Sequence, residues 1–538
     1  MHNAVPVSGR INKLQSTVNV CWARVGILLL SVLITPTLFA SEKGISVQPV
    51  SIPPILQSVI DDAKASAEQG YQQNDHGLDD KLKSIDYETY RSIRFQHDKS
   101  LWNGKNDYEV QFFHPGFLYQ LPVTVNTVDA SNTIHRVPFD STMFNYDGDA
   151  ASLSTLTNEN TGFAGFRVHY PIKTADYKDE FAVFLGASYF RLVGKNQVYG
   201  ISARGLAIDT ALAKGEEFPY FTEFWLIEPE KGQPITIYAR LESPSVAGAY
   251  KFVITPGVDT RVDVQSWLFA RENVEKLGIA PFTSMFLYGE NSEVRPDDYR
   301  PEVHDSDGVL MVTHAGEEIW RVLTNPARLQ ITSLSDSAPA GFGMLQRDGN
   351  WEHYLDAEAN YHKRPGLWVT PVAGFNDGRL EVVEIPTKSE THDNIVAYWV
   401  SNTPFNQGQS RYVAYQLKTV EQHAFKSKLA RVVRTRQGAP YLPGEKITDN
   451  ANQAQRRFII DFAVPEGSAF HIEDLAFVID GLNGEISQQR IYPVNDGLQW
   501  RATFLVTPND KNTVDMRAYI EHQGTRVSEV WNYVYQPQ

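Results

Sequence analysis

The feature of this 538-residue sequence that most limits its fold is a repeated alternation of apolar and polar residues with a period of two. Successive side chains of a strand point to opposite faces of a sheet, so this alternation predicts strands with one buried face. Pro, Gly, Asn and Asp interrupt the alternating stretches every ~8–12 residues, a spacing typical of an antiparallel sandwich. We therefore expect an all-β protein. The clearest strands predicted in the first part of the chain are residues 108–119, 163–170, 181–191 and 235–241.

A second β unit is predicted in the C-terminal part of the chain, with strands at residues 457–464, 498–507 and 513–521. Several short alternating strands within about one hundred residues suit an immunoglobulin-like sandwich. The polar stretch 434–455 is interpreted as a linker, and a lid over the first part is the alternative. One helix is expected near the start, over residues 54–70, where apolar residues recur at helical spacing.

The first forty residues have the pattern of a secretory signal. Basic residues precede an apolar run at 25–33, and the small residues Ala40 and Ser41 follow it. The run is too short for a membrane-spanning helix, although an uncleaved anchor is an alternative. The predicted organisation is therefore a signal peptide at 1–40, a large β domain at 41–425 and an immunoglobulin-like domain at 426–538.

Composition excludes several kinds of function. Cys21, the only cysteine, lies within the predicted signal, so the mature chain has neither disulfides nor thiolate chemistry. The formal net charge is −15, and such a surface disfavours nucleic acid as a partner. The histidines show no metal-ligand spacing, so we expect no metal and no cofactor.

Residues 297–308 form a strongly polar stretch, with five carboxylates next to Tyr299, Arg300 and His304. A solvated surface loop is the ordinary interpretation of such a run. However, tyrosine, arginine and histidine also stack on and hydrogen-bond polyhydroxy ligands. A second polar cluster, 391–394, precedes the strand-like residues 395–399. Two carboxylates on loops of a rigid β scaffold are what acid/base cleavage of a glycosidic bond requires.

Several longer segments suggest a family. Residues 163–166, 185–191, 200–208, 215–219, 297–308, 341–343 and 393–399 occur in the order found in the periplasmic glucan biosynthesis proteins G and D. The sequence resembles this family over about residues 80–538, and both branches remain open. The resemblance implies a large galactose-mutarotase-like β-sandwich followed by an immunoglobulin-like domain. It also implies a periplasmic location and a cleft for linear β-1,2-glucan.

Members of this family are similar to inverting endo-β-1,2-glucanases, in which two aspartates carry the reaction. The matching positions are Asp305 as general base and Asp393 as general acid, and Tyr361 matches a tyrosine near the cleft. The resemblance leaves open a homodimer and an inner-membrane glucan synthase as partners.

Other substrate-binding candidates come from residue chemistry alone. Arg204 could hydrogen-bond sugar hydroxyls, or could pair with a structural carboxylate. Trp351 and Tyr354 could stack on sugar rings, although aromatic residues of a sandwich more often belong to the core.

Three functions compete at this point. The first is an inverting endo-β-1,2-glucanase, and the second is a non-catalytic glucan-binding or assembly factor that works with the synthase. The third is an epimerase, suggested by the mutarotase-like fold, but no His–Glu acid/base pair supports it. The two aspartates favour hydrolysis.

Overall fold

The computed structural model describes residues 52–293, 295–421, 427–441, 455–510 and 512–537. Residues Ile52–Gln538 form one compact unit. The predicted signal peptide and most of the predicted linker lie outside the described residues. None of the helices in the described part of the chain has the length and hydropathy that crossing a bilayer requires.

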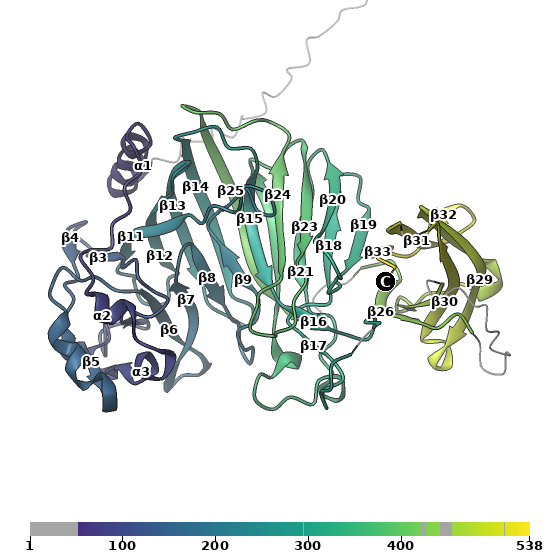
Figure 1. Cartoon of the computed structure of the whole chain (residues 1–538), viewed down its shortest axis with the longest axis horizontal. Coiled ribbons are helices and arrows are strands. Elements are labelled where there is room, and N and C mark those ends of the chain that lie inside the picture. The colour runs from purple at the N-terminus through teal and green to yellow at the C-terminus, as the bar shows by residue number, and fades with distance from the viewer. Residues whose placement is uncertain (1–51, 294, 422–426, 442–454, 511, 538) are drawn as a thin grey trace, which may run out of the picture. The chain divides into compact units, whose positions relative to one another are not determined.

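The structure confirms the predicted all-β class, and two large sheets dominate the described residues (Figure 1). The first sheet contains ten strands: β2 (Glu109–Phe113), β6 (Gly165–Thr174), β7 (Tyr177–Leu185), β8 (Tyr189–Leu192), β9 (Ser202–Arg204), β15 (Leu277–Ser284), β24 (Ile395–Ser401), β23 (Gly378–Glu384) and β20 (Gln330–Asp336) in spatial order, with β10 (Ala207–Ile208) paired to β15.

The second sheet contains fifteen strands: β28 (Leu475–Leu482), β31 (Val514–His522), β33 (Val530–Tyr535), β19 (Glu318–Val322), β18 (Gly308–Val312), β21 (Gly341–Leu345), β22 (Gly366–Ala373), β25 (Ser410–Val420), β14 (Arg261–Ala270), β13 (Val246–Thr255), β12 (Ile235–Glu242), β11 (Tyr220–Ile227), β3 (Thr124–Val128) and β4 (Ile134–Arg136), with β32 (Thr525–Arg526) paired to β31.

Smaller elements complete the described fold. The remaining strands form the pair β1 (Ile93–Phe95) and β5 (Phe144–Tyr146), the pair β16 (Phe286–Tyr288) and β17 (Val303–His304), and a sheet of β26 (Arg431–Gly438), β27 (Arg456–Ala463), β30 (Gln499–Pro508) and β29 (Gly484–Val494). The helices are α1 (Pro54–Ala67), α2 (Asp80–Lys83) and α3 (Tyr87–Arg91), and the 3-10 helices are η1 (His97–Lys99), η2 (Ser141–Met143), η3 (Gly148–Leu156), η4 (Trp351–His353), η5 (Tyr361–Lys363), η6 (Ile472–Asp474) and η7 (Asn495–Gly497).

The main core lies between the two large sheets, and aromatic rings fill much of it. Phe184 of β7 packs edge-on against Phe252 of β13, with ring centroids 5.3 Å apart, and Phe166 of β6 meets Phe224 of β11 at 4.9 Å. These contacts join strands of opposite sheets, as the inward-facing residues of a sandwich do.

The predicted helix is confirmed as α1, which packs its apolar face, including Leu56 and Val59, on the outer side of β12, β13 and β14 (Figure 1). Pro54 occupies the first turn of the helix, where a missing backbone N–H leaves no hydrogen bond unmade.

Two predicted strands are shorter than expected, for local reasons. The strand predicted at 181–191 is a hairpin, because Gly186 and Ala187 both have positive φ and form the tight turn between β7 and β8. The strand predicted at 108–119 ends at Phe113. Pro115 follows, and Gly116 and Tyr119 close a turn through two backbone hydrogen bonds.

The C-terminal strands belong to two sheets. The sheet of β26, β27, β30 and β29 shares a buried core with β28, β31 and β33, which continue the fifteen-stranded sheet through the parallel pairing of β33 with β19. The strands predicted at 457–464, 498–507 and 513–521 are confirmed as β27, β30 and β31. The linker prediction is wrong for residues 434–438, which belong to β26 and are paired with β27.

Candidate active site

Asp305 lies directly after β17, in the second half of the polar stretch 297–308. This half is not a solvated loop, since Asp305 is only 4% exposed and Ser306 is fully buried. The backbone N–H of Asp305 donates to the carbonyl of Met285, 2.8 Å away, which ties the residue to the start of β16. The sequence misleads here because the two carboxylates of this half have partners from distant segments: Asp305 accepts from Arg364, and Asp307 accepts from the backbone N–H of Arg347.

Arg364 is the partner of Asp305, and its guanidinium Nη1 donates to the Asp305 carboxylate. The guanidinium lies over the ring of Tyr361, 4.2 Å from the centroid. Gly200 makes room for it, because a Cβ there would lie 2.9 Å from Arg364 Cδ. Burial raises the pKa of Asp305 to about 6, although the charge of Arg364 opposes this increase.

Asp393 lies in the segment between β23 and β24, and its neighbour Asn394 fixes this segment. The buried Asn394 amide accepts from the Phe286 N–H at 2.8 Å and donates to the Phe286 carbonyl at 3.1 Å. Phe286 belongs to β16, whose partner strand β17 leads into Asp305. One hairpin therefore positions both aspartates, although they are 88 positions apart in the sequence (393 − 305).

The two aspartates influence each other electrostatically. The charge of Asp393 is one of the groups that raise the pKa of Asp305. Asp393 keeps exposed surface, but burial on its other sides raises its pKa, against the positive charges of Arg191, Arg364 and Arg204. Unlike Asp305, Asp393 makes no ion pair with any described residue.

Asp393 lines a cavity of about 540 Å³ together with Arg191, Tyr189 and Tyr119. A second hollow, of about 930 Å³, shares Gln73, Leu121 and Tyr220 with this cavity, so the recess continues across the surface. Its described lining is rich in amide, hydroxyl and arginine groups, which are suited to a polar chain.

Arg300 connects the segments that carry the two aspartates. Its guanidinium donates to Asp298 at 2.7 Å, Asp356 at 2.8 Å and Glu390 at 2.9 Å. Glu390, three residues before Asp393, also accepts from the Tyr361 hydroxyl at 3.1 Å. With three carboxylate partners, Arg300 acts as a clamp between loops and has little capacity left for a sugar hydroxyl.

The other predicted aromatic candidates, Tyr299, Trp351 and Tyr354, are not among the described residues that line this recess. Tyr299 is 72% exposed, and Trp351, at 37%, packs edge-on against His362. Tyr354 is fully buried and donates from its hydroxyl to the Asp348 carbonyl, so its ring offers no face for sugar stacking.

Arg204, the remaining predicted binding residue, is 2% exposed and donates to Glu216 at 2.6 Å. Its guanidinium lies 5.1 Å from the ring centroids of both Tyr189 and Phe218. The structural ion pair anticipated as the alternative is therefore present, and the charge of Arg204 still acts on Asp393.

His304 belongs to a buried cluster of ionisable side chains behind Asp305. Its Nε2 is 2.9 Å from Glu302 and its ring stacks on Phe286 with centroids 5.1 Å apart. Burial alone would lower the pKa of His304, but the hydrogen bond and charge of Glu302 raise it to about 9. This raised pKa favours the protonated form of His304, which is buried and paired with Glu302.

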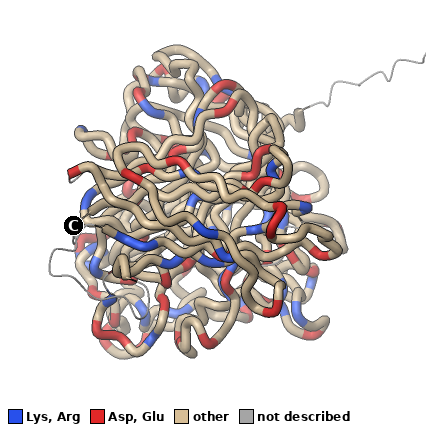
Figure 2. The backbone as a smooth tube through the Cα atoms, turned by 90° about the vertical axis from the view of Figure 1, so that its right-hand side faces the viewer, with Lys and Arg blue, Asp and Glu red and all other residues tan. Residues whose placement is uncertain are grey.

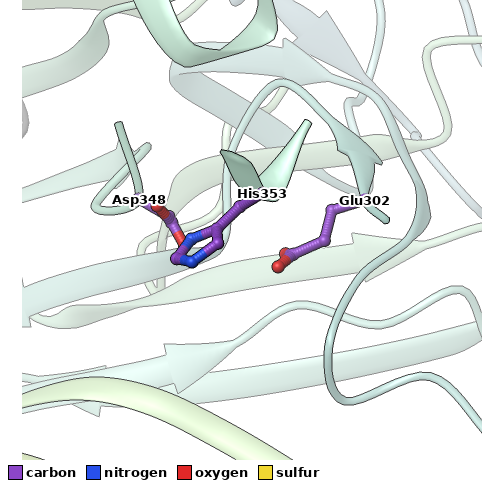
Figure 3. Close-up of side chains that lie close together, drawn as sticks. All are labelled: Glu302, Asp348 and His353. Atoms are coloured by element: carbon purple, nitrogen blue, oxygen red, sulfur yellow. The ribbon is translucent and has the colours of Figure 1, made fainter. Parts of the chain in front are cut away.

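Glu302, Asp348 and His353 point toward one another in this cluster (Figure 3). Their ligand atoms lie within 4.8 Å, close enough for a divalent cation to bind by ligand type. Protonated His304 already neutralises Glu302, however, and Arg434 Nη2 lies 3.0 Å from His353 Nε2. Positive charge therefore already occupies this position, and the residues do not fit a metal ion well.

The comparisons with known proteins show the family of this chain. Residues 56–535 match the family described as periplasmic glucan biosynthesis protein, MdoG. The chain belongs to this family of periplasmic glucan biosynthesis proteins.

Two relatives carry the name glucans biosynthesis protein G. The one from Ralstonia nicotianae is 43% identical over 491 residues, which cover 90% of this chain and 96% of the relative. The one from Vibrio cholerae is 39% identical over 476 residues, covering 88% of this chain and 85% of the relative. A galactose mutarotase related enzyme from Lactobacillus acidophilus matches 44% of the chain at 8% identity and a TM-score of 0.20, a likeness too weak to support an inference.

Three residues of the site were missed from the sequence: Arg364, Glu390 and Asn394. Arg364 lies only three positions after Tyr361, so its place near the predicted tyrosine was a usable signal. Nothing in the local sequence indicates that Glu390 contacts Arg300 or that Asn394 contacts β16, because those contacts depend on the pairing of distant strands.

Proposed function

We propose that this protein is an inverting endo-β-1,2-glucanase of the periplasm that acts on the linear backbone of β-1,2-glucan. Asp305 is the general base that activates a water, and Asp393 is the general acid that protonates the departing oxygen. The single observation that carries this proposal is the unequal environment of two coupled carboxylates, because only Asp305 has an arginine partner.

The base must be ionised at neutral pH, and a pKa of about 6 at Asp305 leaves it mostly ionised there. The acid must hold a proton. The raised pKa of Asp393 favours this, and a sugar bound in the recess would bury Asp393 further and raise its pKa again.

The alternative is a non-catalytic factor that binds glucan and assists an inner-membrane synthase. One observation favours it: Asp305 is 4% exposed and paired with Arg364, as in a structural ion pair. The names of the relatives also refer to biosynthesis and to no hydrolysis.

Incubation with linear β-1,2-glucan separates the two. We expect new reducing ends, which appear first as the α-anomer in NMR spectra because one displacement inverts the β-linkage. Asp305→Asn and Asp393→Asn should each lower kcat by at least ~10²-fold, the usual contribution of general acid–base catalysis. Asp297→Asn, at an exposed position of the same polar stretch, is the matched control.

A β-anomer as first product would indicate a retaining mechanism and remove these roles. Binding of glucan without any cleavage would leave the assembly factor as the function. The location is tested separately, by mass spectrometry of a periplasmic extract, where we expect an N-terminus near Ala40.

A further inference from the structure

A separate cavity, of about 640 Å³, lies beside the end of β33, and neither Asp305 nor Asp393 lines it. Its volume falls within the ~300–1,000 Å³ of small-ligand pockets. Residues from separate parts of the chain form it, among them Asn325, Gln330, Thr387, Gln437 and Gln536.

In two glutamines that line this cavity, the side-chain oxygen accepts no hydrogen bond from the described residues. The Oε1 atoms of Gln437 and Gln536 are buried and have no hydrogen-bond partner among the described residues. The contacts settle which amide atom is the oxygen, because Gln437 Nε2 donates to the Asn291 carbonyl at 2.8 Å and Gln536 Nε2 donates to Gln330 Oε1 at 2.9 Å. If either amide were flipped, its oxygen would face the oxygen that now accepts from its Nε2. Buried acceptors normally have a donor, so both oxygens lack a group that the protein does not supply.

The charge around the cavity is close to balanced. Glu293 is paired with Arg456, and Lys388 is the other charged group among the described lining residues. Apolar surface comes from Pro326, Pro386 and other residues of the lining. An ionic ligand would find little compensation here, and an apolar ligand would leave both amide oxygens without a donor.

We propose that this cavity is a second binding site, for a neutral polyhydroxy ligand such as a terminal sugar residue of the glucan chain. Its hydroxyl groups donate to Gln437 and Gln536 after a small rotation of each amide, and its C–H faces lie against the prolines. The choice of glucan as the sugar rests on the proposed function, but binding here requires no hydrolysis.

The experiment uses the lack of other cysteines in the chain. In the full-length protein, Cys21→Ser combined with Ala327→Cys gives a single thiol at a lining residue that is exposed, and a trifluoromethyl label is attached there. Asp393→Asn is added to slow cleavage. Titration with a linear β-1,2-linked glucotetraose should give a saturable ¹⁹F shift. Gln437→Leu and Gln536→Leu should each raise the Kd at this label by about 3- to 10-fold, the effect of one hydrogen bond.

Gln57→Leu, on the exposed face of α1, is the matched control and should bind as the parent does. A thermal melt of each variant shows whether it folds, and Gln536→Leu, at the end of the chain, tests the proposal if Gln437→Leu does not fold. Three results would each overturn the proposal. The first is no saturable shift with the tetrasaccharide, and the second is an equal Kd in the glutamine variants and the control. The third is a response only to a neutral tetrapeptide. A saturable shift at this label, together with no cleavage of glucan by the protein with Asp393 intact, would support this site while the hydrolase assignment fails.

Discussion

At the scale of single residues, the pair of Asp305 and Arg364 decides the pH range in which the proposed base works. The guanidinium opposes the effect of burial on the pKa of Asp305, which stands at about 6. Arg364→Met removes this charge and keeps an unbranched side chain, so the pKa of Asp305 should rise further. The base is active only when ionised, so the acid limb of kcat/KM, which reports the free enzyme, should move to higher pH.

Lys363→Met is the control, because it removes an exposed positive charge from the adjacent position. Its acid limb should coincide with that of the parent. An unchanged acid limb in Arg364→Met would mean that Asp305 is not the group whose ionisation limits the rate.

Metal dependence is a second question at this scale. Because His304 and Arg434 already place positive charge beside Glu302 and His353, exhaustive chelation should leave glucan cleavage unchanged. The measurement is turnover after dialysis against a chelator. A functional metal site would instead be identified if chelation removed the activity and calcium or zinc restored it. Asp348→Asn should then also abolish the activity.

At the scale of elements, Glu390 holds the segment between β23 and β24 against its neighbours. Glu390→Ala removes its hydrogen bonds from Arg300 and Tyr361, so the segment should gain freedom and Asp393 should lose its alignment. We expect kcat to fall by about tenfold with KM changed less, because misplacement of a reacting group affects turnover more than binding. Glu390→Gln, which keeps an acceptor, should recover part of the loss.

Glu358→Ala is the matched control for this prediction, since that glutamate is also exposed. Steady-state kinetics of the three variants give the answer. An effect on KM alone would place Glu390 in substrate binding and not in positioning.

The sequence predicts an element well when the contacts that form it are close together along the chain, and poorly when they are far apart. The strands of the C-terminal unit and α1 follow from periodicity, which is local. Gly186 and Ala187 interrupt a predicted strand because both have positive φ and form a turn. In the sequence, these two residues can be mistaken for a continuation of the alternating pattern. The clamp at Arg300 depends on Asp356 and Glu390, 56 and 90 positions away, and no local pattern specifies such partners.

At the scale of the whole molecule, contacts between arginine and glutamate side chains connect the C-terminal β unit to the rest. Arg347 donates to Glu529 through both terminal nitrogens, at 2.8 and 2.7 Å, and Arg436 of β26 lies 2.8 Å from Glu290. Positions of Lys and Arg are interspersed with positions of Asp and Glu along the backbone in the view of Figure 2. The connection between the two parts therefore depends on individual side chains, and burial raises the pKa of one of them, Glu290, to about 8.

The stability of the whole protein should consequently decrease as pH rises from 6 to 9. Burial raises the pKa of Glu290 to about 8, and that of Asp307 to about 7. A group whose pKa is raised by folding stabilises the fold below its unfolded pKa and loses that contribution as pH rises through the folded value. At ~1.4 kcal/mol per pKa unit, the free energy of unfolding should fall by on the order of a few kcal/mol.

Glu290→Gln, a permanently neutral mimic of the protonated form, should make the fall smaller, whereas Glu272→Gln at an exposed position should not. Denaturant unfolding at pH 6 and pH 9 measures both, and an equal fall in the two variants would show that Glu290 is not protonated in the folded state.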